Sequence, residues 1–249
     1  MTQPEPYIRV RDLTLGFGTK VLLEKLSFEV EARDIFVVLG GSGCGKSTLL
    51  RHLVGLEPPI SGEIRFADAC APKTRTGRPS CGVMFQSGAL LGSFTVGENV
   101  ALQLSQWTSL PPAAIDTIVK AKLRLVGLEG ALDKLPAEIS GGMKKRAAIA
   151  RAMVLDPQLL FLDEPSAGLD PVTAHELDEL ILALNRSLGT TIVIVSHDLD
   201  SILKVGKRCI MLDREQRGII AEGDPRVLRD SSPDPRVRSF FHRGEALRA

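Results

Sequence analysis

An apolar run that ends in a glycine-rich segment constrains this chain most strongly. Residues Ile35–Leu39 are all apolar, and residues 40–47 then read GGSGCGKS, which matches the pattern G-x-x-x-x-G-K-[ST]. Lys46–Gly55 follows with leucines at helical spacing. A buried strand, a glycine loop and a helix in this order form a P-loop, where backbone N–H groups and the positive helix end hold nucleotide phosphates.

Individual residues of this loop have expected tasks. Lys46 should pair with the β- and γ-phosphate oxygens, the Ser47 hydroxyl should bind Mg²⁺, and Thr48 should reach the α-phosphate. Cys44 occupies a free position of the pattern, where we expect an inert small side chain. The expected nucleotide-binding residues of the loop are Gly40, Gly41, Ser42, Gly43, Cys44, Gly45, Lys46, Ser47 and Thr48.

A second motif is a pair of carboxylates after another apolar run. Leu159–Leu162 is apolar, and Asp163 and Glu164 come next. On periodicity alone, any buried strand that ends at a polar loop would look the same. Beside a P-loop, the pair predicts an Mg²⁺ ligand at Asp163 and a base at Glu164 that polarises the attacking water.

A third motif, Ser140-Gly141-Gly142, precedes a helix predicted over Met143–Leu155. The simplest interpretation is a serine N-cap with turn glycines. A helix N-terminus is also an anion-binding device. Because the same chain already contains one phosphate-binding loop, the motif favours a second contact with phosphate.

Strands and helices alternate around these motifs, which predicts a mostly parallel sheet with helices on both faces. Residues 87–157 interrupt the alternation as a helical insertion, and Ala71–Ser80 is predicted to be a basic surface loop. The predicted strands of the main sheet are Ile35–Leu39, Gly82–Phe85, Leu159–Leu162, Thr191–Val195 and Cys209–Leu212, and Pro171–Leu188 is a predicted helix. Tyr7–Leu15 and Val21–Val30 are predicted strands of a smaller antiparallel sheet, and Gly62–Phe66 is predicted to be another short strand.

Composition excludes several classes of protein. The 249 residues carry a net charge of +1, so the charge balance gives no reason to expect nucleic-acid binding or unaided binding to an anionic membrane. No apolar run approaches the ~18–20 residues of a membrane span, and Met1–Pro6 lacks the pattern of a secretory signal. Four cysteines without CxxC spacing suit a reducing cytoplasm.

The motifs and their order resemble those of ABC-type ATPases. The resemblance extends from about Ile8 to Gly223 and rests on six segments: residues 40–47, Gln86 after a strand, Ser140–Gly142, Asp163-Glu164, Ser166–Asp170 and His197. It implies an α/β P-loop NTPase fold in a domain over residues 1–223. This domain would contain a RecA-like, mostly parallel sheet core, an N-terminal antiparallel β subdomain and a helical subdomain at about 87–157.

The resemblance also implies roles for individual residues. Phe17 would stack on adenine, Gln86 would sense Mg²⁺ and the attacking water, and His197 would contact the γ-phosphate. Ser140, Gly141 and Gly142 would contact ATP held by a second copy, and the loop that ends at Asp170 would link the two sites. The implied catalytic residues are Glu164, His197, Lys46 and Gln86, and the implied metal ligands are Ser47, Gln86 and Asp163.

Two departures from the general family pattern point to a subgroup. The third motif begins with Ile139 where leucine is usual and continues with Met143 where glutamine is usual. Together with Lys144-Lys145-Arg146, Phe85–Leu90 and Asp234–Phe240, these residues resemble the ATPases that serve Mce-type lipid transporters, the Mla system in particular. The resemblance implies an ATP-hydrolysing subunit that drives phospholipid transport across a bacterial envelope from the cytoplasmic side of the inner membrane.

This interpretation implies particular partners and leaves rivals open. The partners would be a second ATPase copy, a permease whose helix docks near Gln86–Asn99, a small regulatory subunit and an Mce-type lipid-binding protein. One rival is another ABC importer or exporter. The other is an ABC ATPase acting on nucleic acid or ribosomes, which typically has fused halves, a coiled coil or a zinc module; none is visible here.

The C-terminal segment 224–249 is expected to be a partner-docking tail outside the ATPase core. Pro233-Asp234-Pro235 would end any preceding helix. Arg236–Arg243 could then form a short helix with Val237, Phe240 and Phe241 on one side. Truncation after Gly223 should then spare nucleotide binding. The alternative is a tail that folds back on its own subunit.

Overall fold

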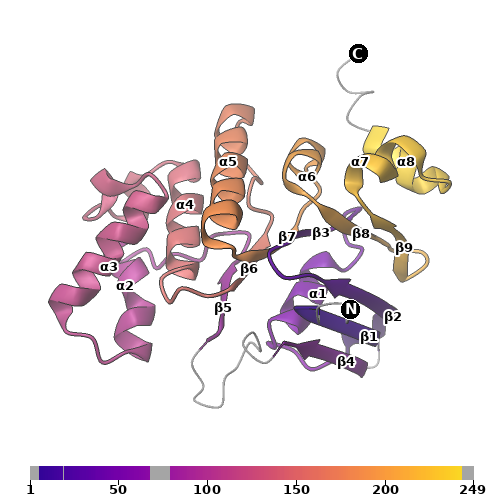
Figure 1. Ribbon diagram of the computed structural model, residues 1–249, viewed down its shortest axis with the longest axis horizontal. Helices are drawn as coiled ribbons and strands as arrows, with labels where there is room; N and C mark the ends of the chain where they lie inside the picture. Colours follow the sequence, from indigo (N-terminus) through magenta and orange to yellow (C-terminus); the bar gives the residue numbers. More distant parts are fainter. Residues whose placement is uncertain (1–5, 19, 68–78, 243–249) are drawn as a thin grey trace, which may run out of the picture.

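Two sheets organise the protein in the computed structural model, which describes residues 6–18, 20–67 and 79–242, with the side chain of Phe17 outside the described part (Figure 1). The larger sheet has the order β5-β6-β7-β3-β8-β9, and its neighbouring strands are parallel except β8 and β9. Its strands are β5 (Cys81–Met84), β6 (Leu159–Asp163), β7 (Thr191–Val195), β3 (Ile35–Gly40), β8 (Arg208–Asp213) and β9 (Gly218–Gly223). The predicted mostly parallel core sheet is confirmed.

The smaller sheet is antiparallel, with the order β2-β1-β4. Its strands are β1 (Ile8–Phe17), β2 (Lys20–Val30) and β4 (Ser61–Phe66). All three were predicted within two residues at each end. The predicted loop Ala71–Ser80 lies almost wholly outside the described residues, of which only 79 and 80 belong to it.

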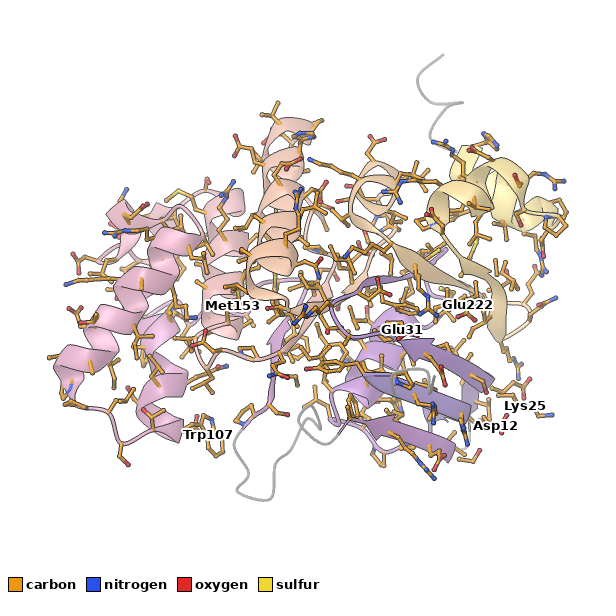
Figure 2. All side chains as sticks on the ribbon, viewed as in Figure 1. Asp12, Lys25, Glu31, Trp107, Met153 and Glu222 are labelled. Carbon is orange, nitrogen blue, oxygen red and sulfur yellow. The ribbon has the colours of Figure 1, made fainter. Side chains whose placement is uncertain are left out.

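Contacts join the two sheets. The rings of Phe28 on β2 and Phe36 on β3 are stacked with centroids 5.6 Å apart. Arg208 on β8 reaches Glu31, which follows β2, and Glu222 on β9, each at 3.4 Å; both glutamates are labelled in Figure 2. The antiparallel sheet therefore packs on the face of the core sheet that carries Phe36, and the Arg208–Glu31 pair links it to β8.

The core sheet is covered on both faces, which explains its continuous apolar strands. Ile35, Val37 and Leu39 of β3 point into one buried cluster, and Phe36 and Val38 point into the other. Helix α1 (Lys46–Leu53) packs in the second cluster, between the two sheets. Helices α5 (Pro171–Leu188) and α6 (Leu199–Val205) contribute to the first cluster.

The helical insertion is confirmed and lies at one end of the molecule (Figure 1). Its elements are α2 (Val96–Trp107), α3 (Pro112–Leu125), the short 3₁₀ helices η1 (Glu129–Ala131) and η2 (Pro136–Glu138), and α4 (Gly141–Ala152). Thr95 and Glu98 form a reciprocal capping box at the start of α2, which ends at Trp107, labelled in Figure 2. None of the described helices is both long and apolar enough to span a membrane.

The C-terminal segment differs from the expected partner-docking tail outside the ATPase core. It forms α7 (Pro225–Ser231), which was not predicted, and α8 (Pro235–His242). Val237, Phe240 and Phe241 on α8 are buried in the same cluster as the core strands. The structure thus agrees with the alternative of a tail folded back on its own subunit. It gives no support to the expectation that truncation after Gly223 leaves the ATPase core intact.

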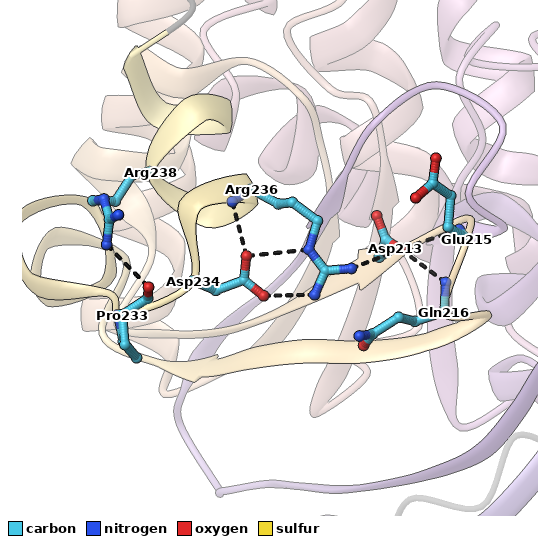
Figure 3. A network of polar contacts seen from close by, with 7 residues as sticks. All are labelled: Asp213, Glu215, Gln216, Pro233, Asp234, Arg236 and Arg238. Carbon is cyan, nitrogen blue, oxygen red and sulfur yellow. Dashed lines mark hydrogen bonds and ion pairs between the residues drawn. The ribbon is translucent and has the colours of Figure 1, made fainter.

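An ion-pair network fixes the start of α8 (Figure 3). The Arg236 guanidinium donates to both carboxylate oxygens of Asp234, at 3.1 and 2.6 Å, and reaches Asp213 at the end of β8 at 3.5 Å. Arg238 donates to the carbonyl of Pro233 at 3.1 Å. The bonds of Arg236 lower the pKa of Asp234 to about 2, so this carboxylate is ionised at neutral pH.

Candidate functional site

A cavity of about 530 Å³ lies at the carboxyl ends of the core strands, where ligands bind in open α/β sheets. It brings together residues that are far apart in the sequence. Its lining residues are Leu22, Gly40, Gly41, Ser42, Gly43, Gly45, Lys46, Ser47, Thr48, Gln86, Glu164, His197, Leu199 and Phe240. Most of the residues predicted from the P-loop, the carboxylate pair and the family resemblance therefore share one site.

The glycine loop between β3 and α1 has the backbone of a phosphate cradle. Gly40, Gly43 and Gly45 adopt φ values of 146°, 73° and 102°, which other residues rarely adopt. A Cβ at Gly40 would lie 2.4 Å from the carbonyl oxygen of Leu212, so that position has no room for a side chain. Nothing lies within 4 Å of the Cβ positions of Gly41 and Gly43. The loop therefore opens towards the cavity at these two glycines.

Lys46 and Cys44 occupy different sides of this loop. The Lys46 ammonium donates to the carbonyls of Gly40 at 2.9 Å and Gly41 at 3.1 Å. Its side chain is buried under the loop and lines the cavity. The Cys44 side chain points into the core, and burial raises the pKa of its thiol. This agrees with an inert Cys44 that contributes only its backbone.

Ser47 and Asp163 meet at the start of α1. The Ser47 hydroxyl donates to Asp163 Oδ1 at 3.2 Å, although the two residues are 116 positions apart. Burial raises the pKa of Asp163, while the bond from Ser47 and the charge of Lys46 oppose the rise. A hydroxyl and one carboxylate side by side are hard oxygen donors, and Mg²⁺ typically combines such ligands with substrate phosphates and water. The donor set therefore fits Mg²⁺.

The pair of Ser47 and Asp163 contains only one of the side chains that most commonly bind metals, the carboxylate of Asp163. Among the described residues, no group of three or more His, Cys, Asp or Glu is placed to hold a metal ion. Ser47 and Asp163, with the amide of Gln86 on the cavity wall, would thus provide only part of a coordination shell. An ion there would depend on the nucleotide for its remaining ligands, as Mg²⁺ does in phosphoryl-transfer sites.

Glu164 and His197 form a second pair across the cavity. His197 Nδ1 lies 2.7 Å from Glu164 Oε1, a hydrogen bond in which the ring N–H donates. Glu164 Oε2 is buried and has no hydrogen-bond partner among the described residues. This orphaned carboxylate oxygen is free to accept a proton or a hydrogen bond from a water molecule. The exposed ring of His197 meanwhile faces the open side.

The backbone at Glu164 is strained. Its φ is 48°, a left-handed conformation that costs a non-glycine residue roughly 1–3 kcal/mol and persists only where the surroundings enforce it. The Glu164 N–H donates to the carbonyl of Val195 at 2.8 Å, and its own carbonyl accepts from Ala167 and from Lys145. These bonds aim the carboxylate at the cavity rather than into the core.

Two cations of α4 hold the loop that carries Gln86. Lys145 donates to the carbonyl of Gln86 at 2.7 Å, and Arg151 donates to those of Gly88 and Ala89 at 2.7 and 2.6 Å. Burial lowers the pKa of Lys145, and the carboxylates of Glu164 and Asp163 oppose that shift. Neither cation was predicted to have a role in the site.

The Ser-Gly-Gly motif is not part of the same cavity. Ser140 caps α4 by accepting from the N–H of Met143 at 3.3 Å. A Cβ at Gly142 would lie 2.4 Å from Thr173 Cγ2, so this glycine permits close packing of α4 on α5. Asp170 caps α5 through the N–H groups of Val172 and Thr173, and its hydrogen bonds to Thr173 lower its pKa. Within the described part of one subunit, none of these residues lines the nucleotide cavity.

Some site residues differ from the prediction. The side chain of Phe17 lies outside the described part, so its stacking role stays a prediction. Leu22 and Leu199 line the cavity although no motif contains them. Phe240 also lines it, from a segment that was predicted to lie outside the ATPase core. Lys145 also has a signal in the sequence, because it shares helical spacing with the buried Ala148 and Ala152 and is therefore a lysine on an apolar stripe.

The P-loop, the Ser47–Asp163 pair and the strained glutamate at one sheet edge define a P-loop nucleoside triphosphatase with a helical subdomain. The chain belongs to the ABC transporter family, whose model matches residues 23–167. This confirms the family that the motifs predicted.

Relatives and a solved structure extend this result. The chain is 40% identical over 240 residues to the intermembrane phospholipid transport system ATP-binding protein MlaF of Escherichia coli K12, covering 94% of this chain and 88% of that one. The identity is also 40% over 240 residues to the probable ribonucleotide transport ATP-binding protein mkl of Mycobacterium leprae, covering 94% and 68%.

The dimeric, post-hydrolysis ATP-binding cassette MJ0796 bound to ADP and Pi matches with a TM-score of 0.77 and 26% identity, over 87% of this chain and 98% of that one. This chain is an ATP-binding and ATP-hydrolysing subunit of the ABC type.

Proposed function

We propose that this chain drives phospholipid transport across a bacterial envelope by hydrolysing ATP in the cavity described above. The observation that supports the hydrolytic roles best is the convergence of Lys46, Ser47, Gln86, Glu164 and His197 on one sheet edge. No single stretch of sequence contains all five, and their side chains match the needs of phosphoryl transfer, which are positioning and charge stabilisation.

The proposed reaction assigns a task to each residue. Lys46 neutralises charge on the β- and γ-phosphates. Glu164 accepts a hydrogen bond from the attacking water through its free Oε2 and takes up its proton. His197, held by Glu164, stabilises charge on the γ-phosphate. Phe17 stacks on the adenine ring, and Thr48 binds the α-phosphate.

Mg²⁺ would be held by Ser47 and Asp163, with Gln86 at its edge, and would supply charge neutralisation on the phosphate oxygens. The Asp163 carboxylate needs to be ionised for this task, and the Ser47 hydroxyl and Lys46 favour that form. Gln86 also orients the attacking water from its side of the cavity.

We propose that two copies complete each site. Ser140, Gly141 and Gly142 contact no nucleotide cavity within their own subunit, yet they form a helix N-terminus suited to an anion. In a head-to-tail dimer they would contact the γ-phosphate bound by the other copy, and the loop ending at Asp170 would lie between the sites. The dimeric state of the MJ0796 structure supports this arrangement.

The segment after Gln86 is proposed to dock a permease helix. Leu91, Phe94 and Leu102 are large apolar side chains that are between 36% and 43% exposed. The buried Asn99 holds this surface in place: its side chain donates to the carbonyls of Leu91 and Phe94 and accepts from the N–H of Leu91. Exposed apolar residues on a rigid surface are typical of an interaction site. Docking there would connect the membrane subunit to Gln86.

Further partners would attach to the outer side of α8, where Arg238, Ser239 and His242 are exposed. We propose contact there with the second ATPase copy or a small regulatory subunit. An Mce-type lipid-binding protein would complete the transporter, and this chain would lie on the cytoplasmic side of the inner membrane. No nucleic-acid partner is proposed, because the net charge is +1.

Phospholipid is the proposed cargo. The name of MlaF supports phospholipid, and the segments around Met143 and Asp234–Phe240 point to the same subgroup, whereas the name of mkl refers to ribonucleotides. The test is to purify the transporter from its native membrane through this chain, and then measure ATP-dependent transfer of labelled phospholipid from reconstituted vesicles. Glu164→Gln serves as the inactive control.

We expect co-purified phospholipid and transfer that stops in the control. Retention of a ribonucleotide in place of lipid, with no ATP-dependent lipid transfer, would contradict the proposed cargo. The hydrolytic roles would be untouched by that result, because they are measured by phosphate release.

A further inference from the structure

One buried cation connects the loop that carries Gln86 to the loop that carries Glu164. The Lys145 ammonium, on α4, donates to the carbonyl of Gln86 at 2.7 Å and to the carbonyl of Glu164 at 3.0 Å. These residues follow β5 and β6, which are neighbouring parallel strands. The side chain is 8% exposed, so both bonds are shielded from water. Lys145 therefore ties the loop of the water-sensing amide to that of the proposed base.

The position of this lysine on α4 adds a third connection. Ser140 at the N-terminus of the same helix belongs to the motif proposed to contact the nucleotide of the second copy. Lys145 lies in the second turn of α4, where helix geometry is rigid. A displacement of the helix would thus move the ammonium relative to the carbonyls of Gln86 and Glu164.

The strained backbone at Glu164 depends on contacts such as the hydrogen bond from Lys145. A left-handed conformation at a glutamate persists only where contacts enforce it, and Lys145 supplies the charged one. The Ala167 N–H shares the same carbonyl at 3.2 Å, but it belongs to the local turn and does not connect Glu164 to α4. Loss of the ammonium would leave the turn formed while the carboxylate loses its fixed relation to Gln86.

We propose that Lys145 is a positioning residue for ATP hydrolysis, which holds Gln86 and Glu164 in register with each other and with α4. The proposal rests on the proposed roles of those two residues. Lys145 contacts neither the nucleotide nor the water, because it is absent from the cavity lining. It acts through two backbone carbonyls, so its removal should affect the rate of the chemical step and spare nucleotide binding.

The test compares variants of the full chain in its assembled transporter. Lys145→Met removes the ammonium with little change in shape, and Lys145→Arg restores a cation with several donors. Lys144→Met is the matched control, because it makes the same change on the neighbouring, partly exposed residue of α4, which has no such contacts. Phosphate release gives kcat and KM, and a fluorescent ATP analogue gives nucleotide affinity.

We expect Lys145→Met to lower kcat by about tenfold or more, since small displacements of catalytic groups have effects of this size. Nucleotide affinity and KM of Lys145→Met should stay within about twofold of the wild-type values. The kcat of Lys145→Arg should lie between those of Lys145→Met and the wild type. Lys144→Met should match the wild type. A merely structural role would instead lower the unfolding temperature and affinity together. If Lys145→Met does not fold, Lys145→Gln, which keeps a donor without the charge, replaces it with the same expected loss.

Glu164→Gln, measured in parallel, separates the two claims. If it abolishes turnover while folded Lys145→Met or Lys145→Gln keeps the wild-type kcat, the tether is overturned and the proposed function stands. If Glu164→Gln keeps turnover, the proposed role of Glu164 fails, whatever the Lys145 variants show.

Discussion

Helix α8 provides a quantitative test of whether the C-terminal segment belongs to the ATPase core. Phe241 is 3% exposed, lies in the main buried cluster and packs edge to face on Phe240 with ring centroids 5.5 Å apart. Phe→Ala changes in cores cost about 3–5 kcal/mol of unfolding free energy. Because α8 is a peripheral helix that can partly collapse into the space, we expect the lower end for Phe241→Ala, about 3 kcal/mol.

This cost has a measurable counterpart in thermal unfolding. For a chain of this size 1 kcal/mol corresponds to about 2–4 °C, so the unfolding temperature should fall by roughly 6–12 °C. Far-UV circular dichroism during heating measures it. Val227→Ala on the neighbouring α7 is the control, because Val227 is 59% exposed and the change should stay within about 0.5 kcal/mol. If Phe241→Ala lowers the temperature no more than Val227→Ala, α8 is a detachable tail.

Three further predictions concern the site and the thiols. Lys46→Ala should weaken ATP binding by about tenfold or more, because it removes charge-assisted hydrogen bonds, and equilibrium binding with an unchanged affinity would contradict the role of Lys46. Gly142→Ala should reduce phosphate release, because the added Cβ would meet Thr173 Cγ2. Adding Thr173→Ser, which removes that methyl group and keeps the hydroxyl, should restore part of the lost phosphate release. No restoration would show that the contact with Thr173 is not the cause. Burial raises the pKa of Cys209 to about 12 and also raises the pKa of Cys44. Iodoacetamide at pH 8 should therefore leave both thiols unlabelled in the folded protein, while the partly exposed Cys81 reacts. Fast labelling of Cys209 would contradict the core packing.

The parts of the fold that were predictable carry strong local patterns. The strand over Ile35–Gly40 is buried on both faces and therefore reads as a continuous apolar run. Glycines at 40, 43 and 45 are required by backbone conformation, so the loop is visible in the sequence. The positions of Gln86 and His197 after strands were sufficient to place both at the cavity once their family resemblance was recognised.

The parts that were missed depend on contacts between distant segments. Helix α2 is an exception, because it was not predicted although its capping pair, Thr95 and Glu98, is a local signal in the sequence. Helical spacing puts Phe240 and Lys145 on apolar sides of their helices. Only tertiary packing shows that Phe240 lines the nucleotide cavity and that Lys145 binds the carbonyl of Glu164. The tail was expected to dock on a partner, because a short helix is marginal in isolation and needs a surface to pack against. The core of its own subunit proved to be that surface.

The role of Glu164 is the central claim, and one comparison tests it most directly. Steady-state phosphate release by the assembled transporter is measured for the wild type and for Glu164→Gln, with ATP affinity measured on the same preparations. The amide keeps the shape of the side chain and loses the base, so binding should be unchanged while turnover falls by about 10²–10⁴-fold. Turnover above about a tenth of the wild-type value, with normal ATP binding, would contradict the assignment of Glu164 as the base.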